Sequence, residues 1–132
     1  MSALAVDTTI EQRVVAVVED DASMRAALAS WLRSAGFVTR TFASAEAFLQ
    51  SPCLTGTAVV ISDMGLPGMS GLELQQELAR SGLEIRIAFV TAETTNFNAM
   101  RAQAVSAGAI AFLQKPFDGE QLLTALRCVT RQ

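Results

Sequence analysis

Short apolar runs alternate with longer amphipathic stretches along most of the chain. Five runs are predicted to be strands: Val14–Val18, Val38–Phe42, Ala58–Ile61, Ile85–Val90 and Ala109–Leu113. An unbroken apolar run such as Val14–Val18 is typical of a strand that is buried on both faces of a parallel sheet. The stretches between the runs carry apolar residues at helical spacing, as helices that cover such a sheet should.

Five helices are expected from that spacing. One helix is expected from Thr95 to Ala107, and the apolar positions of the other four lie between Met24 and Ala35, around Phe48 and Leu49, between Leu72 and Leu78, and between Leu122 and Val129. Gly36, Gly82 and Gly108 stand where three of these helices should end, and Asp118 is suited to cap the last one. Five strand–helix units in succession predict an α/β fold with a five-stranded, doubly wound parallel sheet.

The composition fits one compact domain. The chain has 132 residues, of which 51% are hydrophobic and 17% are charged, which is too apolar for a disordered chain. We expect residues 13–132 to form this domain and residues 1–12 to be a flexible tail. No apolar run is long enough to span a bilayer, and the first residues do not resemble a signal peptide. A cytoplasmic protein without membrane contact is therefore expected.

The net charge and the cysteines argue against two kinds of site. The net charge is −3, which is not the charge of a nucleic-acid-binding surface, so we expect no direct binding to nucleic acid. Cys53 and Cys128 lack metal-ligand spacing, and the sequence has no histidine to complete a site. Two ordinary thiols are favoured over a disulfide.

Acidic, hydroxyl and basic side chains follow the predicted strands. They are Glu19, Asp20 and Asp21 after the first strand, Asp63 after the third, Thr91 after the fourth and Lys115 after the fifth. Ligands of doubly wound sheets bind beyond the carboxyl ends of the strands, near the point where the strand order reverses. Each residue alone has an ordinary explanation, such as a helix cap at Asp21 or Ser23. Their occurrence at several strand ends favours one common site.

This set of side chains suits phosphoryl transfer. Clustered carboxylates repel one another, so a cation that neutralises them binds favourably, and Mg²⁺ prefers oxygen ligands and phosphate. Lys115 offers a positive charge, and Thr91 a hydroxyl group, to the oxygens of a phosphoryl group. Asp63 would be the nucleophile and would form an aspartyl phosphate.

Several segments resemble the receiver domain of bacterial two-component response regulators. They are Val17–Asp21, Ser62-Asp63, Leu66–Leu74, Val90–Glu93 and the stretch from Ala107 to Phe117. The resemblance extends from Arg13 to Arg131 and implies a flavodoxin-like topology. The segments Leu66–Gly71 and Lys115–Phe117 are similar to those of receivers linked to helix-turn-helix transcription factors.

The resemblance implies a metal site at the phosphoacceptor. Glu19 and Asp20 would bind Mg²⁺, or Mn²⁺ as an alternative, together with Asp63 and the backbone carbonyl of Gly65. Asp63 would accept the phosphoryl group. Many relatives carry a larger polar or charged residue at the position of Gly65, so its lack of a side chain leaves the lifetime of the acyl phosphate open.

The resemblance also implies a switch. Lys115 would bind the phosphoryl group, and the Lys115–Pro116 peptide bond would be cis. Thr91 would move toward the phosphoryl group, and Phe112 would fill the space that this movement opens. The change would remodel the fourth helix, fifth strand and fifth helix. The segment from Thr91 to Gly108 is longer than usual, which leaves the shape of this surface open.

The implied function is two-component signal transduction. A histidine kinase or a small acyl phosphate would donate the phosphoryl group, and a fused or partner output domain would control transcription. The receiver would catalyse only its own phosphorylation and dephosphorylation, and phosphorylation would promote a homodimer.

Three alternatives remain to be weighed. A haloacid-dehalogenase-type phosphatase needs a second aspartate two residues after the nucleophile, where this chain has Gly65. A flavodoxin-like cofactor module needs a phosphate-binding loop after the first strand, and the acidic run at Glu19 would repel a phosphate. A receiver-like module that binds partners without phosphorylation is the third alternative, although the complete set of acids, Thr91 and Lys115 disfavours it.

Overall fold

The fold is described from a computed structural model, which covers residues 14–130. The flexible tail predicted for residues 1–12 lies outside the described part of the chain. Within that part, no helix is long and apolar enough to cross a membrane.

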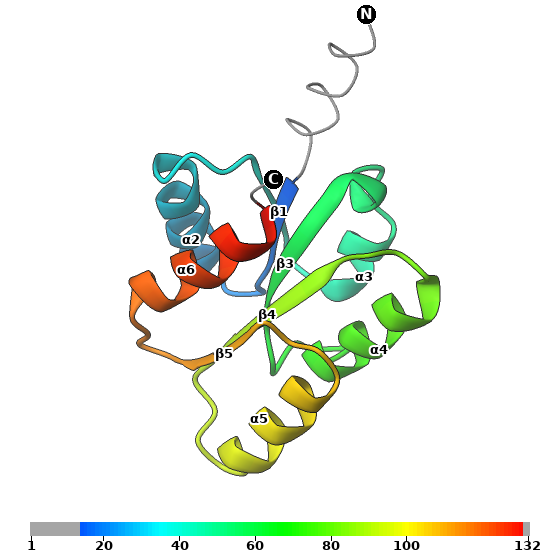
Figure 1. The fold of residues 1–132 in the computed structure, drawn as a ribbon, viewed down its shortest axis with the longest axis vertical. Helices are drawn as coiled ribbons and strands as arrows, with labels where there is room; N and C mark the ends of the chain where they lie inside the picture. The colour runs from blue at the N-terminus through cyan, green and yellow to red at the C-terminus, as the bar shows by residue number, and fades with distance from the viewer. Residues whose placement is uncertain (1–13, 131–132) are drawn as a thin grey trace, which may run out of the picture.

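A five-stranded parallel sheet forms the centre of the domain (Figure 1). Its strands are β1 (Val14–Val18), β2 (Thr39–Phe42), β3 (Thr57–Asp63), β4 (Arg86–Thr91) and β5 (Ala111–Gln114). Their order across the sheet is β2-β1-β3-β4-β5. The chain moves outward from β1 to β2, then returns to the other side of β1 at β3. The strand order therefore reverses between β1 and β3, where such a sheet binds its ligands.

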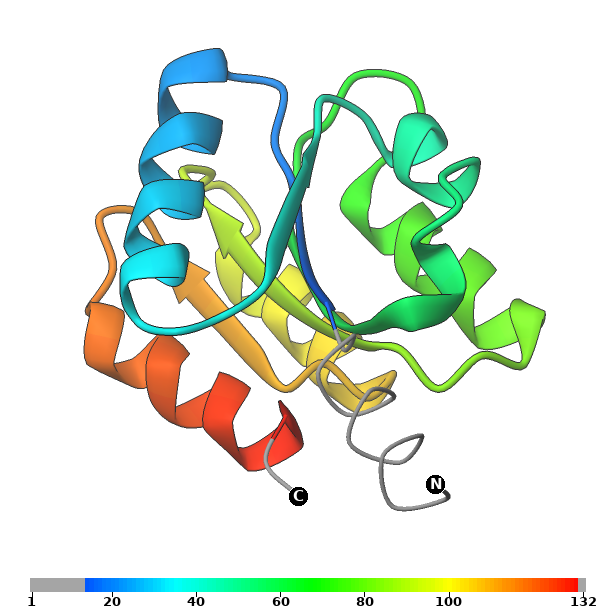
Figure 2. The same cartoon turned by 90° about the horizontal axis from the view of Figure 1, so that it is seen from above.

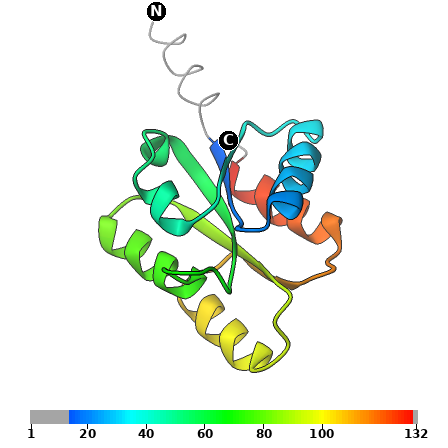
Figure 3. The same ribbon diagram turned by 180° about the vertical axis from the view of Figure 1, so that it is seen from behind.

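Helices cover both faces of the sheet, as the sequence predicts. They are α2 (Ala22–Ser34), α3 (Ala45–Leu49), α4 (Gly71–Ser81), α5 (Phe97–Ser106) and α6 (Gly119–Thr130), with a short 3-10 helix at Leu54–Gly56. Figure 2 shows α2 and α6 on one face, and α3, α4 and α5 on the other. The view from behind in Figure 3 shows the same two layers.

The core has two halves because successive residues of a strand point to opposite faces. In β1, Val15 and Val17 pack with Leu28 and Leu32 of α2, and with the apolar side of α6. Ala16 and Val18 pack on the other face, with apolar residues of α3, α4 and α5. All five residues of β1 are buried, which explains why this strand reads as an unbroken apolar run.

Polar caps define several helix ends. The Asp21 carboxylate accepts hydrogen bonds from the backbone N–H groups of Ser23 and Met24 and so caps α2. Ser70 and Glu73 form a reciprocal capping box at the start of α4. The predicted cap at Asp118 is found as well, since its carboxylate accepts from the N–H of Glu120.

The predicted boundaries of two elements are wrong by about two residues. The helix predicted from Thr95 begins at Phe97, because Asn96 has a φ of 60° and stands outside the helix. The last strand begins at Ala111 rather than Ala109, because the N–H of Ala109 still bonds to the carbonyl of Ala104 at the end of α5. Hydrogen bonds that close a helix end are not visible in an apolar pattern.

Candidate functional site

The predicted site residues lie at the carboxyl edge of neighbouring strands. Glu19 directly follows β1, Asp63 and Thr91 are the last residues of β3 and β4, and Lys115 directly follows β5. In the register of the sheet, Val18 pairs with Ser62, Asp63 with Val90, and Thr91 with Gln114. The parallel pairing therefore carries residues from distant parts of the sequence to one edge, as predicted from the strand pattern.

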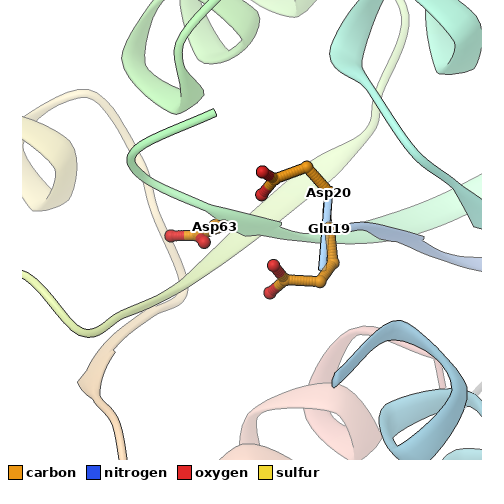
Figure 4. Close-up of side chains that lie close together, drawn as sticks. All are labelled: Glu19, Asp20 and Asp63. Atoms are coloured by element: carbon orange, nitrogen blue, oxygen red, sulfur yellow. The ribbon is translucent and has the colours of Figure 1, made fainter. Parts of the chain in front are cut away.

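Three carboxylate groups form the centre of the site. One oxygen each of Glu19, Asp20 and Asp63 lies within 4.8 Å of the others. Figure 4 shows the three groups pointing the same way from the ends of β1 and β3. Glu19 is only 2% exposed, whereas Asp20 is exposed to solvent. Both residues lie beyond Val18, the last residue of β1, where the strict alternation of a strand no longer applies.

Lys115 neutralises part of this charge. Its Nζ lies 3.0 Å from Glu19 Oε1 and 3.4 Å from Asp63 Oδ2. Burial alone would lower the pKa of Lys115, but the hydrogen bond to Glu19 and the negative charges of Asp63 and Glu19 outweigh it. The pKa of Lys115 is therefore raised above its ordinary value, and the lysine is charged at neutral pH.

Glu19 is held in an environment that disfavours its ionised form. Burial raises the pKa of Glu19 above 4.5, and the negative charge of Asp63 acts in the same direction. Hydrogen bonds from Lys115 and from the N–H of Asp21 to its carboxylate oppose the shift without cancelling it. A cation bound beside Glu19 would stabilise its ionised carboxylate, as Lys115 already does in part, so Glu19 is a suitable ligand for a cation.

The donor set fits a hard divalent cation. All three side chains offer carboxylate oxygens, which Mg²⁺ prefers over nitrogen or sulfur ligands. Three ionised carboxylates and one ammonium group leave two negative charges, which a divalent ion would balance. Glu19, Asp20 and Asp63 are therefore the residues of this chain that could hold such an ion.

Gly65 and Gly71 shape the backbone around Asp63. The N–H of Gly65 lies 3.3 Å from Asp63 Oδ1, and a Cβ atom on Gly65 would meet nothing within 4 Å. A Cβ atom on Gly71 would lie 2.8 Å from the carbonyl oxygen of Asp63 and 2.8 Å from the ring of Phe89. Gly71 thus allows the start of α4 to pack directly against the end of β3, whereas Gly65 faces open space.

Thr91 and Phe112 lie one and two strands away from Asp63. Thr91 is 1% exposed, and its hydroxyl oxygen accepts a hydrogen bond of 3.1 Å from the N–H of Glu93. Phe112 is buried between Phe89 and Phe97, with ring centroids 5.9 and 5.1 Å away. In this state the ring of Phe112 therefore joins α5 to the sheet. The Lys115–Pro116 peptide bond is cis.

Three residues whose side chains bond to the backbone of other elements were not identified from the sequence. Arg25 donates a hydrogen bond of 2.8 Å to the carbonyl of Glu19. Glu46 accepts one of 2.9 Å from the N–H of Met69, in the loop after Asp63. Gln75 is buried, and its amide reaches α5. Only Gln75 has a signal in the sequence, as a polar residue on the apolar side of a helix.

Comparison with known proteins identifies the family. The model of the response regulator receiver domain matches residues 15–127. Nodulation protein W of Bradyrhizobium diazoefficiens is 41% identical over 119 residues, which are 90% of this chain and 52% of that protein. Response regulator protein TmoT of Ectopseudomonas mendocina is 38% identical over 117 residues, which are 89% of this chain and 52% of that protein. The chain spans about half the length of the curated relatives it matches.

Solved structures agree with this assignment. The crystal structure of FixJ-N superposes with a TM-score of 0.77 at 28% sequence identity, covering 91% of this chain and 94% of that one. The sequence match, the shared fold and the acidic cluster at the strand ends lead to the same conclusion. This chain belongs to the response regulator receiver domain family.

Proposed function

We propose that this chain is the phosphoacceptor of a two-component system and that Asp63 carries the phosphoryl group. The observation that supports this most directly is the approach of Glu19, Asp20 and Asp63 to within 4.8 Å, with the Lys115 ammonium beside two of them. The side chain of Asp63 is 16% exposed, so a donor can reach it.

In the proposed reaction, a carboxylate oxygen of Asp63 attacks the phosphorus atom of the donor. The new O–P bond forms as the bond from phosphorus to the donor's leaving group breaks, and the leaving group takes the electron pair. Bound Mg²⁺ would supply positive charge that reduces the repulsion between the carboxylate and the phosphoryl oxygens. Lys115 leaves its present acidic partners and pairs with a phosphoryl oxygen.

The other assigned roles follow from the same proposal. Glu19, Asp20 and the backbone carbonyl of Gly65 complete the metal site with Asp63, for Mg²⁺ or Mn²⁺. The hydroxyl of Thr91 turns toward the phosphoryl group and gives up its bond from Glu93. Phe112 then changes its packing against Phe97 on α5.

The partner-binding surface of this proposal consists of α5, β5 and α6. Of the ten residues of α5, only Ala104 is buried, so few apolar contacts oppose a shift of this helix. A change at Phe112 would therefore be transmitted to α5 first. Phosphorylation on this account also promotes a homodimer through α5 and α6.

The partners are those of a signalling relay. A sensor histidine kinase donates the phosphoryl group, and a fused or separate output domain controls transcription without nucleic-acid binding by the receiver itself. The chain acts on no other substrate and catalyses only its own phosphorylation and dephosphorylation. Both cysteines are free, which agrees with a reducing, cytoplasmic location.

The test is intact-protein mass spectrometry after incubation with phosphoramidate, with and without Mg²⁺. We expect a single phosphoryl adduct that needs Mg²⁺ and is absent from Asp63→Asn. Asp21→Asn is the matched control, because Asp21 belongs to the same acidic run but caps α2 and is outside the cluster. It should be phosphorylated like the parent.

Failure of the parent to form an adduct, with the fold intact and rapid hydrolysis excluded by quenching at short times, would contradict the proposal. The chain would then be a receiver-like module that binds its partners without phosphorylation. An adduct that persists in Asp63→Asn would place the phosphoryl group on another residue.

A further inference from the structure

Arg25 contacts the backbone of both acidic residues at the end of β1. Its Nη1 donates a hydrogen bond of 2.8 Å to the carbonyl of Glu19 and lies 3.5 Å from the carbonyl of Asp20. Arg25 stands in the second turn of α2 and is half-buried. One guanidinium nitrogen therefore approaches two successive peptide groups of the β1–α2 loop.

These two peptide groups determine where the metal-binding side chains lie. The plane of each peptide sets the direction in which the neighbouring side chain leaves the backbone, and Glu19 and Asp20 must point into the same space to share an ion. The rest of the loop is held by other bonds. The N–H of Glu19 donates to the carbonyl of Phe42, and the carboxylate of Asp21 caps the helix. Arg25 adds the contact on the carbonyl side.

The charge of Arg25 is suited to this position. Glu19, Asp20 and Asp21 are three successive acids whose carboxylates repel one another. A guanidinium group keeps its charge under all ordinary conditions, and its hydrogen bonds to carbonyl oxygens are stronger than those of a neutral donor. Arg25 can thus keep the acidic loop in one conformation before an ion binds.

We propose that Arg25 is a positioning residue that holds the backbone of Glu19 and Asp20 in the conformation needed for metal binding. This proposal rests on the proposed function, in which these acids bind Mg²⁺. Arg25 does not contact the ion or the phosphoryl group on this account. It acts through the two carbonyl groups.

The proposal and simple electrostatics predict opposite effects of Arg25→Met. If Arg25 acted only through its charge, its removal would strengthen Mg²⁺ binding, because a positive charge near the dication would be lost. If it positions the acids, its removal weakens binding. Groups that orient metal ligands typically contribute about 10- to 100-fold to metal affinity, so we expect Mg²⁺ to bind at least about tenfold more weakly.

Arg33 offers a matched control on the same helix. Its Nη2 donates a hydrogen bond of 2.9 Å to the carbonyl of Thr39, so it also fixes a backbone carbonyl from α2. Thr39 starts β2, at the opposite end of the strands from the acidic cluster. Arg33→Met should therefore lose a comparable hydrogen bond without affecting Mg²⁺ binding.

The experiment is a Mg²⁺ titration of the 132-residue chain at constant ionic strength, followed by the backbone amide signals in NMR. We expect weaker binding in Arg25→Met, parent-like binding in Arg33→Met, and an intermediate value in Arg25→Lys, which keeps the charge without the planar group. The phosphorylation rate of Arg25→Met with phosphoramidate should approach that of the parent at saturating Mg²⁺. A rate that stays low would mean that Arg25 acts beyond metal binding, against the proposal.

Several outcomes would overturn the assignment. Unchanged or tighter Mg²⁺ binding in Arg25→Met would show that the carbonyl contacts do not position the acids. Equal weakening in Arg33→Met would indicate general loosening of α2. If Arg25→Met does not fold, the Mg²⁺ affinity of Arg25→Lys is the test. An affinity equal to that of the parent would show that the planar guanidinium is not needed to position the acids. Absence of Mg²⁺ binding to the parent would instead contradict the proposed function.

Discussion

Lys115 Nζ lies 3.0 Å from Glu19 Oε1, although the two residues are 96 positions apart in the sequence. The contact joins the end of β5 to the end of β1 across the carboxyl edge of the sheet. The same nitrogen lies 3.4 Å from Asp63 Oδ2. Lys115 therefore stabilises carboxylates that would otherwise repel one another. The same ammonium group is the one expected to bind a phosphoryl group.

Replacing Lys115 with methionine should destabilise the domain in the absence of Mg²⁺. The change leaves Glu19 and Asp63 without their cation, and loss of a charged hydrogen-bond partner costs about 1.5–3 kcal/mol of the free energy of unfolding. Urea denaturation at neutral pH measures this quantity. Arg80→Met is the control, because Arg80 pairs with Glu77 on the exposed side of α4, where such a pair contributes about 0–1 kcal/mol. Equal effects of the two changes would contradict this account of Lys115.

The raised pKa of Glu19 predicts opposite pH effects on the free and Mg²⁺-bound protein. The folded state binds a proton at Glu19 more readily than the unfolded state does. The contribution of Glu19 to the free energy of unfolding therefore rises as the pH falls through its folded pKa, and this gain is complete below the unfolded pKa. Mg²⁺ requires the ionised carboxylate, so its binding weakens over the same range, beginning above pH 4.5.

Thermal unfolding with and without Mg²⁺, repeated across this acidic range, checks the prediction. The stabilisation by Mg²⁺ should shrink as the pH falls from neutral. In Glu19→Gln the group can no longer ionise, so the part of the pH dependence due to Glu19 should disappear. An unchanged profile in that variant would show that other acids account for the whole effect.

The fold and the main site could be predicted because both depend on patterns that are local in the sequence. Val14–Val18 is buried on both sides of β1, and this burial is what makes the run apolar. Asp63 and Thr91 could be placed together because parallel strands carry their carboxyl ends to one edge. The switch roles of Thr91 and Phe112 required the family resemblance, since each residue type alone has several ordinary uses.

The remaining contacts could not be predicted because they depend on how the helices are rotated and spaced. Arg25 reaches back to the carbonyl of Glu19 from a second helical turn, and nothing in its spacing distinguishes it from an exposed arginine. The difference in burial between Glu19 and Asp20 depends on which way the chain turns after β1. Such features follow only from three-dimensional packing.

Gln75 is expected to restrain α5. Its buried side-chain amide donates a hydrogen bond of 3.0 Å to the carbonyl of Ala104, the one buried residue of α5. Gln75→Leu keeps a side chain of similar size but removes this bond, which should lower the free energy of unfolding by about 0.5–1.5 kcal/mol. Amide hydrogen exchange should become faster in α5 than in α2, because the lost bond is local to α5.

Gln76→Leu is the control for this change. Gln76 is the next residue of α4 and is exposed, so its replacement should leave exchange in α5 unchanged. Equal acceleration in both variants, or acceleration spread evenly over all helices, would mean that Gln75 contributes only to general stability. In the proposed switch, a looser α5 should also raise the fraction of protein in the active conformation.

Gly65 is expected to shorten the lifetime of the phosphoryl group. A Cβ atom at this position would meet nothing within 4 Å, and the backbone has no positive φ that would strain a side chain. Gly65→Asn should therefore fold normally and place an amide next to the Asp63 carboxylate, where it limits the approach of water. We expect the phosphoryl group to be lost roughly tenfold more slowly, which corresponds to an additional barrier of about 1.4 kcal/mol.

The decay of the adduct in intact-protein mass spectra, after removal of the donor, measures this rate. Gly82→Asn is the control for a glycine replacement remote from Asp63, at the end of α4, and its decay should match that of the parent. Parent-like decay in Gly65→Asn would show that water reaches the acyl phosphate by another path.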